Sequence, residues 1–254
     1  MTRSIDLSVV IPVLNDQSCL ENLLNTLARY RLDNAEIIVV DGGSTDRTRE
    51  IAALAGVRLV SSEAGRGNQL QAGFRASAGS LVLMLHADSG VSSDLFYEIT
   101  KIIKSRINRG EQCWGRFKAS LFSDVYPRSL WIIAAAMEMR SRATSICTGD
   151  QGIFVSRELL LKVGGIPEQP LMEDIELSKR LRAHIRPVII SKLIHASPRK
   201  WEDDGLVRTV LRMWIYRARY FFGGDPELLS RDYYKRATVK VLDVSYVFFP
   251  DRPS

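Results

Sequence analysis

The chain has 254 residues, 46% of them hydrophobic and 25% charged, which is the composition of a folded globular protein and excludes a disordered or collagen-like one. Its formal charge of +6 favours anionic partners such as nucleotides, phosphorylated lipids or membrane surfaces, while no zinc-finger spacing, RNP-like aromatic motif or basic tract indicates nucleic acid. Three widely spaced cysteines and the lack of a signal-peptide pattern or a bilayer-length apolar run predict a cytoplasmic protein.

The first half of the chain alternates strand-like and helix-like segments. Apolar, β-branched runs predict strands at 7–14, 36–41, 57–62 and 80–85. Apolar residues at helical spacing and glycines at C-cap positions predict helices at 19–32, 45–56 and 68–79. This alternation predicts an α/β fold with a mostly parallel sheet that helices cover on both faces.

The second half is less regular. We expect strands at 113–121 and 186–195, and a short strand that runs into a helix at 151–165. Further helices are expected at 129–143, 172–184 and 205–224. No Pro-, Gly- or Ser-rich linker separates the halves, so we predict a single domain over residues 1–234 with a C-terminal tail at 235–254. Within this domain, we expect residues 1–110 to form a nucleotide-binding half and residues 111–234 to form a second half that completes the ligand-binding pocket.

Polar residues follow three of the predicted strands. They are Asn15 and Asp16, the segment 41–46, and the segment 86–89. Because ligands of parallel sheets bind beyond the carboxyl ends of the strands where the strand order reverses, we expect these clusters to meet in one crevice.

Two glycine-containing loops could bind phosphate. In "VVDGGSTDRT", Asp41 ends a strand, Gly43 permits a tight turn, and Ser44 can cap the next helix, whose N-terminus favours an anion. An ordinary strand-to-helix turn would explain every residue except Asp41. In "GRGNQL", Arg66 lies between glycines at a helix start and could contact a diphosphate, although a solvated surface charge is the commoner role. Neither loop is a dinucleotide-binding GxGxxG motif.

The strand at 80–85 ends in "HADS". A carboxylate at the tip of a rigid strand can bind Mg²⁺ or Mn²⁺ together with diphosphate oxygens and water, so Asp88 is the candidate metal ligand. A capped turn would also account for Asp88, but not for His86 two residues earlier on the same face.

Five stretches in order resemble glycosyltransferase family 2 with the GT-A fold, and more narrowly the bacterial arsenosugar-biosynthesis-type glycosyltransferases. They are "SVVIPVLND", "IIVVDGGSTDRT", "GRGNQLQAGFRASAGSLVLMLHADS", "TGDQGIFVSRELLLKVGGIPEQPLMEDIELSKRL" and "SPRKWEDDG". The resemblance covers roughly residues 7–234. It implies a metal-dependent, inverting transfer of a sugar from a nucleoside-diphosphate sugar to an acceptor hydroxyl, with Mg²⁺ or Mn²⁺ as cofactor.

The resemblance also assigns donor and metal residues. "HAD" matches the family's DxD motif, so Asp88 would bind the metal, with His86 at the more variable position and His195 as a further candidate ligand. A neutral imidazole at position 86 does not supply a carboxylate's charge, which leaves the identity of the metal open. The expected donor-binding residues are Pro12, Asn15, Asp41, Gly43, Ser44, Arg66, Asn68, Gln71, His86, Ala87, Arg199 and Trp201.

"MEDIEL" matches the family's acidic pair, which implies that Asp174 is the catalytic base with Glu173 as its electrostatic partner. Two close carboxylates raise the pKa of one of them, which helps a base to act near neutrality. Acidic residues placed favourably in a first helical turn are the simpler local explanation. The expected acceptor-binding residues are Gly149, Asp150, Gln151 and Trp114.

Two other functions stay open at this point. One is a sugar-phosphate nucleotidyltransferase, although the first strand lacks the Gly-rich loop such enzymes carry, and the other is a non-catalytic nucleotide-sugar-binding protein. The acceptor is a small molecule or a lipid-linked one. In the helix at 205–224 an apolar stripe could lie on the inner face of a membrane, but we expect it to pack on the core. The stripe consists of Val207, Val210, Leu211, Trp214, Ala218, Phe221 and Phe222.

Overall fold

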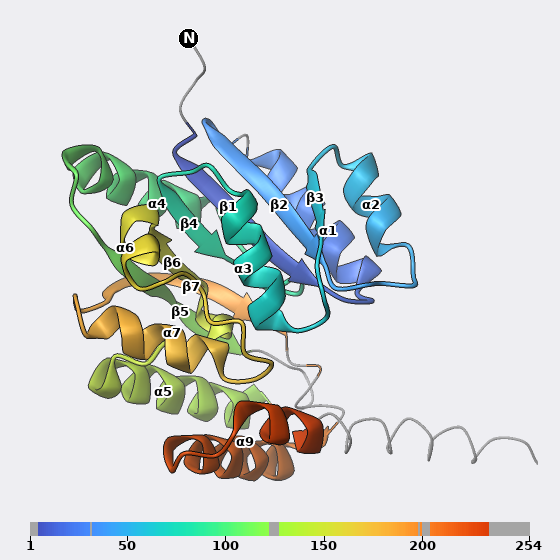
Figure 1. The fold of residues 1–254 in the computed structure, drawn as a ribbon, viewed down its shortest axis with the longest axis vertical. Coiled ribbons are helices and arrows are strands. Elements are labelled where there is room, and N and C mark those ends of the chain that lie inside the picture. Colours follow the sequence, from blue (N-terminus) through green and yellow to red (C-terminus); the bar gives the residue numbers. More distant parts are fainter. Residues whose placement is uncertain (1–4, 31, 122–126, 198, 200–203, 234–254) are drawn as a thin grey trace, which may run out of the picture.

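The computed structural model describes residues 5–30, 32–121, 127–197, 199 and 204–233 (Figure 1). Trp201 and the predicted tail at 235–254 therefore lie outside the described residues. The strands are β1 (Leu7–Val13), β2 (Ala35–Asp41), β3 (Arg58–Ser61), β4 (Leu81–Met84), β5 (Trp114–Leu121), β6 (Ile153–Ser156) and β7 (Val188–Ala196). The α-helices are α1 (Gln17–Arg29), α2 (Thr48–Leu54), α3 (Arg66–Ala76), α4 (Ser93–Ser105), α5 (Pro127–Thr144), α6 (Arg157–Lys162), α7 (Glu173–Arg182) and α9 (Leu206–Phe221). Short 3₁₀ helices are η1 (Ile107–Arg109) and η2 (Gly149–Gln151).

The strands form a seven-stranded sheet in the order β3-β2-β1-β4-β6-β5-β7. β1 pairs in parallel with β2 and β4, β2 with β3, and β5 with β7. β6 is antiparallel to both of its neighbours, β4 and β5. The prediction of a mostly parallel, mixed sheet is confirmed.

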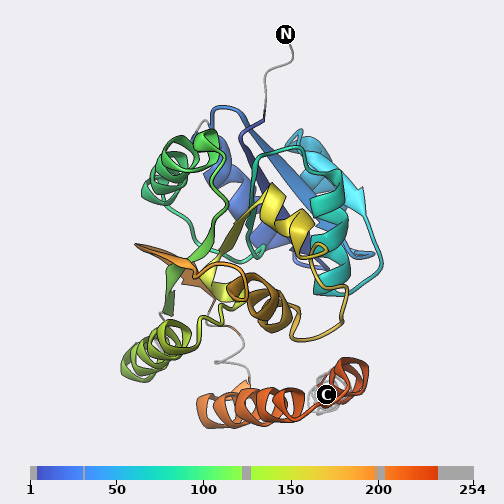
Figure 2. The ribbon, with the colours of Figure 1, turned by 60° about the vertical axis from the view of Figure 1, so that its left-hand side comes forward.

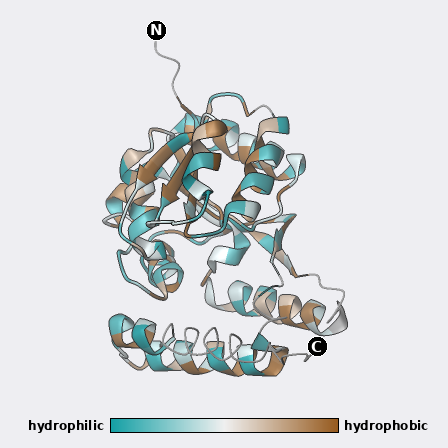
Figure 3. Ribbon diagram, turned by 90° about the vertical axis from the view of Figure 1, so that its right-hand side faces the viewer, coloured by the Kyte–Doolittle hydropathy of each residue, from teal (hydrophilic) through white to brown (hydrophobic). Residues whose placement is uncertain are grey.

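Helices cover the sheet on both faces, as predicted (Figures 1 and 2). One hydrophobic cluster joins the sheet to α1 and α4, and a second joins the opposite face to α3, α6 and α7. The central strands are mostly hydrophobic, whereas the helices alternate between hydrophobic and hydrophilic residues (Figure 3). Strands buried on both faces and half-covered helices produce this difference.

Helix α4 was not among the predicted elements. Its apolar residues nevertheless have helical spacing and are buried on the α1 face of the sheet. They are Leu95, Phe96, Ile99, Ile102 and Ile103. The periodicity of this segment was sufficient to predict the helix.

Helices α5 and α9 lie beyond the sheet at one end of the molecule (Figure 1). A third, small cluster joins the end of β5 to α5 and to Leu206, Val210 and Met213 of α9. The prediction that the apolar stripe of α9 packs on the core is wrong, because apart from Val210 its residues are exposed. The helix instead turns Thr209 and Tyr216 toward the protein.

Candidate active site

The strand order reverses between β1 and β4, since the chain proceeds from β1 outward to β3 and then returns to the other side of β1. Two of the polar clusters expected at this edge bond each other directly, and Arg199 links the third, through Asp88, to Asp16. The Asn15 backbone N–H donates to Ser44 Oγ at 2.9 Å, and the Thr45 N–H donates to Asn15 Oδ1 at 2.8 Å. The expected crevice is therefore at the topological switch point of the sheet, where open α/β sheets bind their ligands.

Asp41 is fully buried and organises the turn that follows β2. Its Oδ1 accepts the Ser44 N–H at 3.1 Å, and its Oδ2 accepts the Gly43 N–H at 3.3 Å. Gly43 has a φ of 98°, a conformation that glycine adopts without steric cost. Pro12 lies nearby within β1, paired with Val40. In this structure the Asp41 carboxylate bonds the backbone of the turn.

Arg199 follows β7 and bridges the ends of β1 and β4. Its Nη2 lies 2.8 Å from Asp16 Oδ2 and 3.4 Å from Asp88 Oδ2. The hydrogen bond with Asp16 raises the pKa of the Arg199 guanidinium. Asp16 belonged to the predicted crevice but was assigned no role from the sequence, because nothing local indicates a partner 183 residues away.

Asp88 is the candidate metal ligand, and its side chain is 31% exposed beside Arg199. Within the described part of the chain, no group of three or more His, Cys, Asp or Glu residues could hold a metal ion. A single carboxylate at a strand end fits Mg²⁺ or Mn²⁺ as a co-ligand of a diphosphate, because such ions take one or two protein ligands and complete their octahedron with phosphate oxygens and water. The donor set therefore fits a metal that arrives with the nucleotide.

The two candidate histidines contact different segments of the chain. His86 Nδ1 lies 3.3 Å from Asp150 Oδ1, and a Cβ atom at Gly149 would lie only 2.3 Å from His86 Nε2. The imidazole is thus packed directly against the backbone of η2. His195 is exposed on β7, where its backbone N–H and C=O both bond Gly90, two residues after Asp88.

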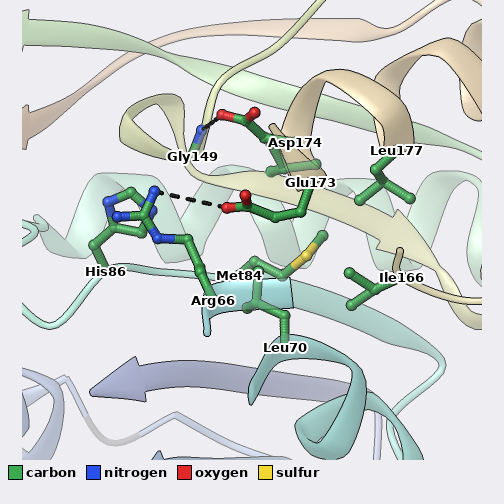
Figure 4. A pocket seen from close by; sticks show the side chains of 10 residues that line it. Arg66, Leu70, Met84, His86, Gly149, Ile166, Glu173, Asp174 and Leu177 are labelled. Carbon is green, nitrogen blue, oxygen red and sulfur yellow. Dashed lines mark hydrogen bonds and ion pairs between the residues drawn. The ribbon is translucent and has the colours of Figure 1, made fainter. Parts of the chain in front are cut away.

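Asp174 lies in the first turn of α7, and both of its oxygens accept backbone hydrogen bonds, of which Figure 4 shows the one from Gly149. Oδ2 accepts the Gly149 N–H at 3.0 Å, and Oδ1 accepts the Ile175 N–H at 2.7 Å. Met172, which precedes α7, has a φ of 63°, a left-handed conformation that is strained for a methionine. The backbone is therefore held in an unfavourable conformation where it delivers the acidic pair.

Glu173 is 4% exposed, and its Oε1 lies 3.7 Å from Arg66 Nη1 (Figure 4). Burial raises the pKa of Glu173, Asp174 raises it further, and Arg66 opposes the rise. The buried environment thus favours the protonated form of Glu173, the predicted electrostatic partner of the base.

A pocket lies between these groups, with an apolar wall from β4, α3 and α7 and a polar wall from His86, η2 and the acidic pair (Figure 4). It is lined by Arg66, Leu70, Met84, His86, Gly149, Ile153, Ile166, Glu173, Asp174 and Leu177. Residues of the predicted segments "GRGNQL", "LMLHADS", "TGDQGIF" and "MEDIEL" therefore line one pocket.

Trp114, Gln151 and Gln71 are buried outside the pocket, and a polar side-chain atom of each bonds another part of the protein. Trp114 is fully buried and donates its Nε1–H to Ile185 O, so it is not available to an acceptor. Gln151 is fully buried in a capping box with Thr148. Gln71 is 8% exposed, and its Oε1 accepts the Ile166 N–H at 2.8 Å. The assignments of Trp114 and Gln151 to the acceptor and of Gln71 to the donor are corrected accordingly.

The remaining predicted donor residues lie near the same loops. Ala87 is buried between His86 and Asp88, and Asn68 is half-buried in the first turn of α3. Gln69 was not among the predicted site residues, and its buried Nε2 donates to Val13 O at 2.7 Å and Val40 O at 2.9 Å. This amide joins α3 to the ends of both central strands.

Residues 8–158, more than half of the chain, match the family model described as glycosyl transferase family 2. The chain belongs to glycosyltransferase family 2. This family-2 glycosyltransferase is 26% identical over 216 residues to a PGL/p-HBAD biosynthesis glycosyltransferase of Mycobacterium bovis, a match that covers 80% of each chain. It is also 26% identical to a β-monoglucosyldiacylglycerol synthase of Synechocystis sp., over 89% of this chain and 49% of the relative. The chain thus spans about half the length of that relative.

Solved glycosyltransferases share the fold. The mannosyltransferase PcManGT of Pyrobaculum calidifontis, in complex with GDP-Man and Mn²⁺, has a TM-score of 0.60 at 20% identity and covers 88% of this chain and 66% of its own. S. aureus TarS 1-349 in complex with UDP has a TM-score of 0.60 at 20% identity, over 77% of this chain and 62% of its own. The predicted GT-A fold is confirmed, and family membership sets the nucleotidyltransferase alternative aside.

Proposed function

We propose that this family-2 glycosyltransferase moves a sugar from a nucleoside diphosphate to an acceptor hydroxyl with inversion, using Mg²⁺ or Mn²⁺. The observation that carries the proposal is the position of Asp174, whose carboxylate lies at the wall of a pocket bounded by the strand-end loop of His86. Inversion in a single displacement requires one base and no covalent intermediate, and Asp174 supplies that base.

Asp174 is suited to accept a proton because its orientation is held by the backbone. Each oxygen accepts one N–H, from Gly149 or Ile175, and keeps a second lone pair for the acceptor hydroxyl. A base within hydrogen-bond reach can remove the hydroxyl proton as the new bond to the sugar forms. Glu173 remains beside it as an electrostatic partner, and Arg66 stabilises the charged form of Glu173.

The strand-end loops provide the donor side. Asp88 would hold the metal ion, with His86 and His195 as candidates to complete its surroundings. The ion would supply positive charge to the departing diphosphate. Arg66 and Arg199 add two guanidinium groups near the same edge, which favour the negative charge that develops on the leaving group.

The test is release of nucleoside diphosphate from UDP- and GDP-sugars by the purified full-length chain with Mg²⁺ or Mn²⁺. These donors are chosen because structural neighbours hold UDP or GDP-Man. Asp174→Asn is expected to lower the rate about 10²- to 10⁴-fold, since it removes the base and preserves the shape. Asp88→Asn is expected to abolish metal-dependent release.

Asp33→Asn is the matched control, because Asp33 is an exposed aspartate in the turn before β2. Its rate should equal that of the parent chain. Release that survives Asp174→Asn unchanged, or that is unaffected by EDTA, would contradict the proposed roles. Absence of any release together with tight nucleotide-sugar binding would favour a non-catalytic binding protein.

A further inference from the structure

The outer face of α9 is an apolar stripe that the described part of the protein leaves uncovered. Its residues recur at helical spacing and are 53% to 91% exposed. They are five residues of the predicted stripe, Val207, Leu211, Trp214, Phe221 and Phe222, together with Ile215, and these six are the stripe from here on. Contiguous exposed apolar surface of this kind marks an interaction site in soluble proteins, because leaving it in water costs free energy.

The orientation of α9 is anchored by the polar side chains on its inner face. Tyr216 Oη donates to Asp232 Oδ2 at 2.9 Å, and Arg212 pairs with Asp204. Thr209 is fully buried, and Met213 packs against α5. Turning the helix to bury its apolar stripe would break these contacts, so the stripe faces outward for a structural reason.

The charge of α9 indicates what covers it. Its sixteen residues include four arginines and no aspartate or glutamate. Arg208 is exposed beside the stripe, whereas Arg219 pairs with Asp232. Trp and Phe on one face with arginines around it is the composition of a helix that lies in the headgroup region of a bilayer.

Helix α5 extends this apolar character. It contacts α9 through the small cluster at the end of β5 and exposes Trp131, Ile132 and Met139 on its own outer face. No helix in the described ranges is long and apolar enough to cross a membrane. Helices α5 and α9 therefore both expose large apolar side chains.

We propose that α9 is an interfacial helix that docks this enzyme on an anionic lipid bilayer, with Leu211, Trp214 and their neighbours in the stripe entering the headgroup region. A second copy of the chain is a poorer partner, because an isologous contact would bring two helices together that each expose Arg208 beside the stripe and contain no acidic residue. The inference goes beyond sugar transfer and does not depend on the identity of the donor.

The experiment is flotation of the purified full-length chain with two kinds of vesicle, phosphatidylcholine alone and equal parts of phosphatidylcholine and phosphatidylglycerol. The chain is expected to float with the anionic vesicles. The double variant Leu211→Gln, Trp214→Gln should lower the partition coefficient at least about tenfold, because it removes two side chains that enter the headgroup region. Leu54→Gln, Leu161→Gln is the matched control, since both leucines are exposed on other helices.

A second pair of variants tests whether the positive charge of α9 contributes to binding of anionic vesicles. Arg208→Gln should weaken binding to anionic vesicles about fivefold, since one arginine near such a surface contributes about 1 kcal/mol, while Arg109→Gln on η1 should leave it unchanged. The substituted residues are exposed, so thermal unfolding should match the parent chain.

Three results would overturn the proposal. One is failure of the parent chain to float, and another is equal flotation of the stripe variant and its control. The third is a light-scattering mass that falls on the Leu211→Gln, Trp214→Gln substitution without any vesicle binding, which would identify a second copy as the partner. Nucleotide release measured on the same preparations keeps a failure of the proposed chemistry separate from a failure of docking.

Discussion

Replacing Gly149 with alanine would place a methyl group where the His86 ring now lies. The new Cβ would be 2.3 Å from Nε2 and 2.7 Å from Cε1 of that ring, against an ordinary contact distance of 3.4 Å or more. One of the two must move by about 1 Å, and His86 is held by Asp150 while Gly149 is held by Asp174. Because φ at this position is not left-handed, the backbone itself tolerates alanine.

We expect Gly149→Ala to lower the free energy of unfolding by about 1 to 2 kcal/mol, the range for forcing an added methyl group into a packed site. In a chain of this size that corresponds to a fall of about 2 to 8 °C in Tm. Displacement of Asp174 by about 1 Å should also reduce the rate of nucleotide release by up to about 10²-fold.

A double-mutant cycle checks the physical cause. In the His86→Ala background the ring is gone, so Gly149→Ala should cost less than about 0.5 kcal/mol, within the additivity error of independent sites. Thermal unfolding of the four proteins measures the coupling. An equal loss of Tm in both backgrounds, or no loss in the parent, would refute the assigned contact between Gly149 and His86.

Two further predictions concern stability. Glu173 has a raised pKa in the folded chain, so its contribution to stability is present below its ordinary pKa of 4.5 and is lost as pH rises through the folded pKa. Glu173→Gln should therefore flatten the fall of Tm above pH 4.5. An unchanged slope of Tm against pH would contradict the burial argument. Gln69→Met should lower the free energy of unfolding in urea by about 1 to 3 kcal/mol, because Val13 O and Val40 O each lose a buried donor. Gln112→Met is the control, since Gln112 is half-buried. A loss no larger than that of the control would contradict the role of Gln69.

Most of the sheet could be predicted because each strand carries its own local pattern. β1, β2 and β4 are predominantly apolar, and the helices between them have amphipathic spacing. The convergence of the strand-end loops followed from topology alone. The site was therefore predictable wherever its residues directly follow a parallel strand.

Contacts between distant segments could not be predicted in the same way. Arg199 meets Asp16 and Asp88 only after the whole domain has folded, and no local pattern encodes that pairing. The burial of Trp114 and Gln151 likewise depends on neighbours from other elements. For α9 the sequence identifies an apolar face but not which side the protein covers, since periodicity is the same for a helix packed inward and one facing outward.

The reversed direction of β6 determines which part of its sequence can reach the pocket. Met84 at the end of β4 pairs with Ile153 at the start of β6, so the segment that precedes β6 lies beside the segment that follows β4. A slip of this pairing by one residue would carry η2 about 3.4 Å along the strand and exchange the two faces of β6. Single-residue insertions or deletions between η2 and β6 would thus separate Gly149 from Asp174, whereas length changes at the far ends of the same two strands would leave that contact in place.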